Sequence, residues 1–194
     1  NETCQNYGEK QLGNTFYQVW LEDIQSIETK LTIMKKYDLG GVAAWLRWRK
    51  RRKDAGKPDD KPNLVMSTAY QVVWEKCCQL WDVEMRVVPI SLDKPTLCPE
   101  EAIKMCDENT ICIVPIVGVT WTGLNDDIEA LDKLLDQFNT KTGYNIPIHV
   151  DAASGGFILP FIKPDYKWDF RLKWVWSIST SGHKYGLVYP GLGW

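Results

Sequence analysis

One stretch decides the fold: residues 146–156 have the sequence Ile-Pro-Ile-His-Val-Asp-Ala-Ala-Ser-Gly-Gly. The part from 146 to 150 is short, apolar and rich in β-branched residues, as expected of a strand buried in a sheet. Asp151 stands where that strand would end, and small residues follow it. Similar short apolar runs alternate with longer amphipathic stretches from Asn63 onward. This alternation predicts an α/β fold, in which a mostly parallel sheet is flanked by helices.

The predicted strands cover residues 63–66, 84–89, 112–117, 146–150 and 174–179, and the predicted helices cover 69–80, 99–106 and 126–138. The last helix would carry one apolar stripe, made of Ile128, Leu131, Leu134, Leu135 and Phe138. In a parallel sheet, ligand-binding groups gather at the carboxyl ends of the strands. Asp151 and the segment after Ser179 are both predicted to lie at that edge.

Composition limits the classes of protein that fit. The 194 residues suffice for one domain with a core, or for part of one. The net charge of −2 gives no overall attraction to nucleic acid or anionic membranes. No apolar run approaches the roughly 18 residues of a membrane span, and no leader opens the chain. We therefore expect a soluble, cytoplasmic protein with no membrane partner.

The cysteines and histidines give little support to a metal site. Six cysteines form no Cys-x-x-Cys pair, and only two histidines accompany them. We therefore expect no bound metal. The adjacent Cys77 and Cys78 lie among apolar residues, so we expect reduced thiols that act as small hydrophobic side chains.

Two other segments permit more than one interpretation. Residues 47–53 read Arg-Trp-Arg-Lys-Arg-Arg-Lys, a run that could bind nucleic acid. Apolar residues precede it and Asp-Ala-Gly-Lys-Pro follows it, which favours the solvated end of a helix, and we expect no nucleic-acid partner. In the first 38 residues, one amphipathic helical face is suggested by the spacing of Tyr17, Trp20, Leu21, Ile24, Ile27 and Leu31.

Two stretches, 149–157 and 179–186, place functional groups beside small residues after predicted strands. The residues after Asp151 are small enough for a flat ligand to approach the backbone. Lys184 follows a glycine and a histidine in a segment rich in hydroxyl groups. A lysine forms a Schiff base only when part of its population is uncharged, and burial favours the uncharged form. Each residue also has a simpler interpretation when it is considered alone. Lys184 could be an ordinary surface lysine, Asp151 could cap a helix or form a turn, and Gln71 could be a surface residue of a helix.

Taken together, these stretches resemble the cofactor motifs of the group II pyridoxal-phosphate decarboxylases. Trp-Asp-Phe-Arg-Leu at 168–172, Ala-Gly-Lys-Pro at 55–58 and Cys-Asp-Glu-Asn-Thr at 106–110 are similar to glutamate decarboxylases of plant, fungal and bacterial type. The resemblance runs from about Gly40 to Trp194. It implies part of the large domain of a fold-type I enzyme that binds pyridoxal 5'-phosphate.

The resemblance also implies roles for individual residues. Lys184 would hold the cofactor as a Schiff base, and Asp151 would pair with its pyridine nitrogen. Ala153 and Gln71 would pack on opposite faces of the ring, and Thr120 would lie beside cofactor and substrate. The implied reaction is α-decarboxylation of L-glutamate to 4-aminobutanoate and carbon dioxide. The full-length parent would be a homodimer or a higher homo-oligomer.

The phosphate site departs from the family pattern. Ser181 and His183 would donate hydrogen bonds to the phosphate. Family members also carry a glycine, two small hydroxyl residues and a Glu-Ala dipeptide before the helix near Gly40, where this chain has Thr-Ile-Met-Lys-Lys-Tyr-Asp-Leu at 32–39.

We therefore divide the chain into a divergent segment, 1–38, and a partial pyridoxal-phosphate-binding large domain, 39–194. The first segment would come from a mistranslated exon junction, a reading-frame change or a degraded gene copy. The departure leaves a second interpretation open, in which the chain is a catalytically inactive remnant that acts at most as an interaction module.

Overall fold

The computed structural model describes residues 6–12, 15–21 and 40–194, with side chains from Ala44 onward. The chain divides into two compact units, Asn1–Ala43 and Ala44–Trp194. Among the described helices, none is long and apolar enough to cross a membrane. Within the same described part of the chain, no three metal-ligating side chains gather in one place.

The first unit contains a β-hairpin. Strand β1 (Asn6–Leu12) pairs antiparallel with β2 (Thr15–Leu21), and Leu12 lies opposite Thr15. The predicted helical face is therefore wrong for Tyr17, Trp20 and Leu21, which belong to β2. The physical reason is composition, because aromatic and β-branched residues dominate β2 and favour an extended chain. Ile24, Ile27 and Leu31, the rest of that predicted face, lie outside the described residues.

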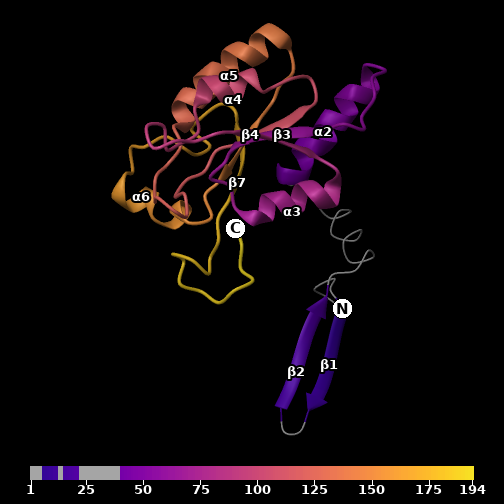
Figure 1. Ribbon diagram of the computed structural model, residues 1–194, viewed down its shortest axis with the longest axis vertical. Helices are drawn as coiled ribbons and strands as arrows, with labels where there is room; N and C mark the ends of the chain where they lie inside the picture. The colour runs from indigo at the N-terminus through magenta and orange to yellow at the C-terminus, as the bar shows by residue number, and fades with distance from the viewer. Residues whose placement is uncertain (1–5, 13–14, 22–39) are drawn as a thin grey trace. The chain divides into compact units, whose positions relative to one another are not determined.

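The second unit is built on a five-stranded parallel sheet with the order β4-β3-β5-β6-β7 (Figure 1). Its strands are β3 (Asn63–Ser67), β4 (Glu84–Val88), β5 (Thr110–Val114), β6 (Ile148–Asp151) and β7 (Val175–Ser179). All five predicted strands are present, so the predicted α/β fold with a mostly parallel sheet is confirmed.

Proline changes three of the predicted strand ends, and β4 ends at Val88, before Pro89. Strand β5 ends before Pro115, whose nitrogen carries no hydrogen for the ladder, and β6 begins after Pro147 for the same reason. Both prolines still accept hydrogen bonds, from the amides of Asp151 (2.9 Å) and Ile113 (3.1 Å) respectively. The chain beyond β5 therefore stays beside β6, where Ile116 forms a bridge with Asp151.

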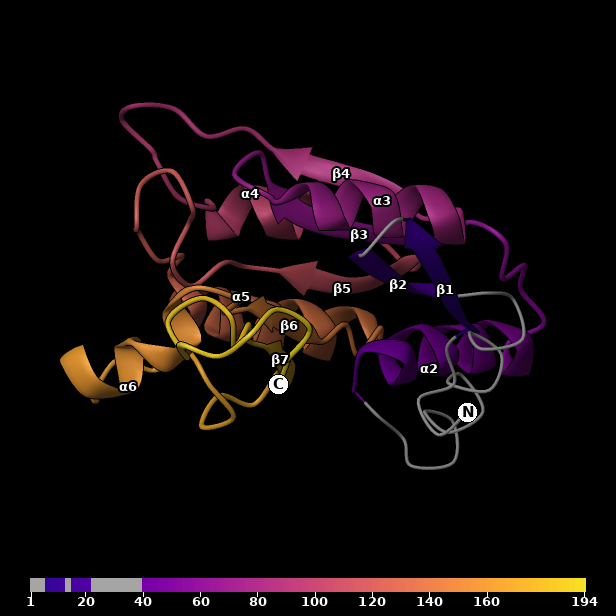
Figure 2. The same cartoon turned by 90° about the horizontal axis from the view of Figure 1, so that it is seen from below.

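Helices cover both faces of the sheet (Figures 1 and 2). Helices α4 (Pro99–Lys104) and α5 (Ile128–Thr142) pack on one face, and α2 (Gly40–Asp54) and α3 (Val72–Trp81) pack on the other. Successive strand residues point to opposite faces. Val65 therefore joins the core under α4 and α5, whereas Leu64 and Met66 join the core that contains Trp48 and Cys78. The short helices η1 (Gly155–Phe157) and α6 (Leu159–Ile162) follow β6.

Helix α5 carries the predicted apolar stripe. Ile128, Leu131 and Leu135 are buried, and Phe138 packs against the same core. Leu134, the remaining member of the predicted stripe, is half-buried. The helix continues to Thr142, four residues beyond the predicted end, because Asn139 also points inward. The Asn139 side chain donates a hydrogen bond to the carbonyl of Ile146 and accepts one from its amide, each at 2.9 Å. A buried polar residue thus occupies the core-facing position that follows the last apolar residue of the pattern.

The cysteines on the α2 and α3 side of the sheet are free thiols. Burial raises the pKa of Cys78 to about 11 and that of Cys112 to about 12, and neighbouring cysteines add to both shifts. These two side chains therefore stay protonated near neutral pH and pack as small hydrophobic groups, as predicted for Cys78.

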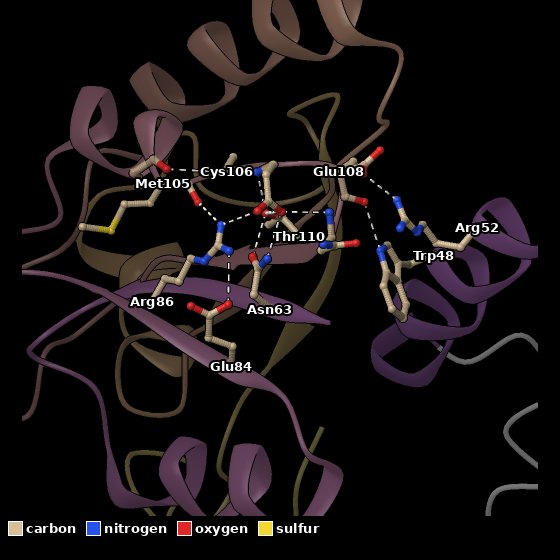
Figure 3. A network of polar contacts seen from close by, with 12 residues as sticks. Trp48, Arg52, Asn63, Glu84, Arg86, Met105, Cys106, Glu108 and Thr110 are labelled. Carbon is tan, nitrogen blue, oxygen red and sulfur yellow. Dashed lines mark hydrogen bonds and ion pairs between the residues drawn. The ribbon is translucent and has the colours of Figure 1, made fainter. Parts of the chain in front are cut away.

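A network of polar contacts closes the amino-terminal edge of the sheet (Figure 3). The Asn63 side chain donates to Asp107 (2.9 Å) and accepts from the Thr110 hydroxyl (2.7 Å). Arg86 forms an ion pair with the same Asp107 carboxylate at 2.7 Å. Burial opposes ionisation of Asp107, but the hydrogen bonds from Asn63 and Arg86 prevail and lower its pKa. These contacts tie the first residues of β3 and β5 to the turn before β5.

The basic run at 47–53 belongs to the last turns of α2, as predicted. Trp48 and Arg52 point inward, and both contact Glu108: the indole donates to its carbonyl at 3.1 Å, and the guanidinium meets its carboxylate at 3.0 Å. Lys57 pairs with Glu108 as well, and Arg49 pairs with Asp59 at 2.7 Å. Much of the positive charge is thus balanced within the chain.

Candidate active site

The two chemically promising stretches meet at the carboxyl edge of the sheet. Asp151, the last residue of β6, pairs in register with Ser179, the last residue of β7. Beyond the strands, the amide of Ser181 donates to the carbonyl of Ala153 at 3.2 Å. The segment that carries Lys184 therefore starts directly beside the segment that carries Asp151, as expected from the parallel arrangement.

The Asp151 carboxylate is buried and held from two sides. Asp151 is only 6% exposed to solvent. The indole of Trp74 donates to Oδ2 at 2.8 Å, and the amide of Ala153 donates to Oδ1 at 3.1 Å. A carboxylate has about four acceptor positions, so each oxygen keeps capacity for one more donor.

His149 lies on the same side of β6 as Asp151, two residues earlier. Its Nδ1 lies 2.7 Å from the Ser177 hydroxyl and its Nε2 lies 3.3 Å from the Ser179 hydroxyl. Burial lowers the pKa of His149, although the negative charge of Asp151 acts in the opposite direction. The imidazole is therefore kept neutral near pH 7, because both its surroundings and its ordinary pKa favour that form.

A cavity of about 590 Å³ opens beside these strand ends. Among the predicted site residues, Lys184 and Thr120 line it. The remaining lining comes from the loop after β5, the helices η1 and α6, and the segment after β7, and includes Gly118, Asn125, Ser154, Ile158 and Leu187. A volume of this size is typical of sites for small organic ligands.

Gln71 and Thr120 meet at the rim of the site. Gln71 is the N-cap residue of α3, and its side-chain amide donates to the Thr120 hydroxyl at 2.5 Å. This bond connects the start of α3 to the loop after β5. Gln71 therefore lies next to a residue that lines the cavity, although it is not itself part of the described lining.

The other predicted residues are less closely grouped. Ala153 and Ser181 are half-buried and joined by the backbone bond described above. Ser181 also forms an antiparallel bridge with Gly193, because the segment after β7 folds back on itself. His183 is exposed and lies outside the described lining of the cavity. The structure thus brings Lys184 and Thr120 to one cavity, and Asp151, Ala153 and Ser181 to one pair of strand ends.

The small residues after Asp151 serve packing within the chain. A Cβ on Gly155 would lie 2.5 Å from Cγ1 of Val117, and one on Gly156 would collide with the Thr180 hydroxyl. The sequence suggested that these residues let a ligand approach the backbone. Gly155 and Gly156 let the loop after β5 and the segment after β7 approach closely, and Ser154 and Gly155 also line the cavity.

Sequence reasoning gave no role to Trp74 or His149, both of which contact the Asp151 site. Trp74 stands three residues after Gln71, one helical turn along α3, so the spacing places both on one side of that helix. This spacing is the one sequence signal that links Trp74 to the site. Its hydrogen-bond partner, Asp151, is 77 positions away in the sequence, and no local pattern identifies that contact.

The donor set fits the flat aromatic cofactor that the resemblance implies. A buried carboxylate with free acceptor capacity suits a protonated ring nitrogen, and a half-buried lysine lines a cavity large enough for a small organic ligand. Positions 32–39, where the resemblance would place further phosphate-binding residues, lie outside the described residues.

Comparisons with known proteins give the family. Residues 36–194 match the pyridoxal-dependent decarboxylase conserved domain. Glutamate decarboxylase beta of Listeria innocua is 56% identical over 158 residues, and glutamate decarboxylase 5 of Arabidopsis thaliana is 53% identical over 156 residues. These matches cover 80% of this chain but 34% and 32% of the relatives, so the chain spans about a third of their length.

A solved structure agrees. Glutamate decarboxylase of Lactobacillus brevis superimposes with a TM-score of 0.77 at 51% identity, over 80% of this chain and 36% of that protein. At this identity, the likeness extends beyond the general α/β architecture. The chain belongs to the pyridoxal-dependent decarboxylase family.

Proposed function

We propose that this chain supplies the cofactor-binding part of a glutamate decarboxylase, which converts L-glutamate to 4-aminobutanoate and carbon dioxide. The observation that carries the proposal is the register of β6 and β7, which sets the buried carboxylate of Asp151 beside the segment that holds Lys184. The names of the relatives at 51–56% identity support glutamate as the substrate.

Bound pyridoxal 5'-phosphate would supply a sink for the electrons left behind when the carboxyl group departs. Lys184 would hold the cofactor covalently through its amine and then yield that position to the substrate amine. Asp151 would pair with the ring nitrogen and keep its proton in place. Because His149 is neutral, it adds no positive charge that would compete for this carboxylate.

Other residues would orient the ring and its phosphate. Ala153 and Gln71 would pack on opposite faces of the ring, and Thr120 would lie beside the substrate. The hydrogen bond between Gln71 and Thr120 supports a joint role, since it connects Gln71 to a residue that lines the cavity. Ser181 and His183 would donate hydrogen bonds to the phosphate, and the exposure of His183 leaves it accessible for that contact.

We further propose the boundaries 1–38 for a divergent segment and 39–194 for the partial large domain, and a cytoplasmic protein that forms a homodimer or a higher homo-oligomer.

Titration of the purified chain with pyridoxal phosphate tests the proposal. We expect an absorption band of the lysine-bound cofactor that disappears in Lys184→Ala and persists in Lys141→Ala, which changes an exposed lysine at the end of α5. No band from a correctly folded chain would favour the inactive remnant. Because the chain spans a third of its relatives, we expect little carbon dioxide from glutamate, and substrate selectivity is to be measured on a full-length form.

A further inference from the structure

We propose that Trp74 is a positioning residue, whose indole N–H fixes the orientation of the Asp151 carboxylate toward the cofactor. This inference rests on the function proposed above and deepens it. The contact is direct, 2.8 Å from Nε1 to Oδ2, and it joins α3 to the end of β6.

The carboxylate has little freedom to rotate. One oxygen receives the indole N–H of Trp74 and the other receives the amide of Ala153. The two donors come from different elements, a helix on one face of the sheet and the loop at its edge. Rotation of the carboxyl group would break both bonds inside a site where Asp151 is 6% exposed. The acceptor positions of Asp151 that Trp74 and Ala153 do not use are therefore held in one orientation.

The indole is itself held in place. Trp74 lies in the first turn of α3, where its amide donates to the carbonyl of Gln71 at 3.0 Å. Its ring meets the ring of His149 edge to face, with centroids 5.4 Å apart and an interplanar angle of 65°. His149 is in turn bound to Ser177 and Ser179 at both ring nitrogens. A chain of contacts thus runs from β7 through His149 to Trp74.

The chemistry of the donor also matters. An indole N–H is uncharged, so it orients the carboxylate without neutralising it. A lysine or arginine at this position would form an ion pair with Asp151 and compete with a protonated ring nitrogen. A neutral donor on Oδ2 leaves the negative charge available for the cofactor. The arrangement suits a carboxylate whose task is to pair with another cation.

The first test uses the chain without cofactor. The indole N–H signal of Trp74 is identified in a ¹H–¹⁵N spectrum by its loss in Trp74→Phe. We expect this N–H to exchange slowly with solvent and to become at least tenfold less protected in Asp151→Ala, because the bond is then lost. An unchanged exchange rate in Asp151→Ala would overturn the contact on which the proposal depends.

The second test adds pyridoxal phosphate. Trp74→Phe keeps an aromatic ring but lacks the donor, so we expect about tenfold weaker cofactor binding and a changed pH dependence of the absorption band. Trp81→Phe is the matched control, since this residue lies at the other end of α3 and packs against Trp45. A role confined to folding would lower the unfolding midpoint of Trp74→Phe without changing the band.

The outcomes separate the two proposals. A normal band in Trp74→Phe, with wild-type affinity and pH dependence, would overturn the positioning role and leave the proposed function standing. No band in the wild-type chain would overturn the proposed function and the positioning role together. In that case, the exchange measurement would identify a contact that serves the fold alone.

Discussion

The polar groups at the amino-terminal ends of the parallel strands are arranged differently from those at the carboxyl-terminal ends. At the amino edge, Asn63, Asp107 and Arg86 satisfy one another in a closed network (Figure 3). At the carboxyl edge, Asp151 is oriented by two donors but keeps free acceptor positions, and Lys184 lines a cavity of about 590 Å³. The comparison indicates that one end of the strands mainly stabilises the fold, while the other is available for chemistry.

The largest effect on stability is expected at the amino edge. Asn63 is fully buried and its amide serves both Asp107 and Thr110. In Asn63→Ala, the carboxylate of Asp107 and the hydroxyl of Thr110 each lose a hydrogen-bond partner. We therefore expect the free energy of unfolding to fall by about 3 kcal/mol. Urea denaturation measures this change.

Asn109→Ala is the control for that variant, because Asn109 joins the network through its backbone amide and carbonyl. We expect its free energy of unfolding to change by less than about 1 kcal/mol. Equal losses in the two variants would show that the side-chain network does not stabilise this edge.

A smaller loss is expected from Gly155→Ala at the carboxyl edge. The added Cβ would lie 2.5 Å from Cγ1 of Val117, so the loop must shift at a cost of about 2 kcal/mol. Gly193→Ala is the control, since its Cβ would lie 3.9 Å from the Thr180 carbonyl oxygen. Thermal unfolding compares the two. A Gly155→Ala variant as stable as Gly193→Ala would contradict the close packing of this loop.

A still smaller effect, confined to acid, is expected from His149. Burial lowers its pKa in the folded chain, so the unfolded chain binds a proton first as the pH falls. Stability from this source is complete above about pH 6.5, the ordinary value, and declines as the pH falls through the folded pKa. His149→Gln should flatten the stability curve in that window, and wild-type and variant curves that stay parallel through it would contradict the lowered pKa of His149. Urea denaturation at several pH values decides.

The smallest effect is expected on the exposed side of α2. Lys50 pairs with Asp54 one turn later at 2.6 Å, and both side chains are largely exposed. Such pairs contribute little, so Lys50→Ala should change the free energy of unfolding by less than about 0.5 kcal/mol. A loss above 1 kcal/mol would mean that the basic run has a structural role beyond Trp48 and Arg52.

The fold was largely predictable because each buried strand is a short run of β-branched residues between helical stretches. Where the predicted elements differ from the structure, the causes are local. Pro115 and Pro147 move the ends of two strands, and the polar, inward-facing Asn139 interrupts the apolar pattern before the last turn of α5. The spacing of Tyr17, Trp20 and Leu21 also fits a helix, so it does not predict the hairpin, although β2 is rich in strand-forming residues.

The site was predictable to a lesser degree. Asp151 and Lys184 follow predicted strands, and the resemblance supplied the roles that spacing alone left open. The contact of Trp74 with Asp151 was not predictable, because it joins two elements 77 positions apart through a single indole hydrogen. Local patterns report which side of a helix a residue occupies, whereas tertiary packing decides which strand end it meets.

Chemical trapping tests whether Lys184 holds the cofactor. The chain is mixed with pyridoxal phosphate, reduced with borohydride, digested and mapped by mass spectrometry. We expect the pyridoxyl group on Lys184, with a lower yield in Asp151→Ala. Labelling spread over exposed lysines, with Lys184 unmodified, would show that Lys184 does not hold the cofactor.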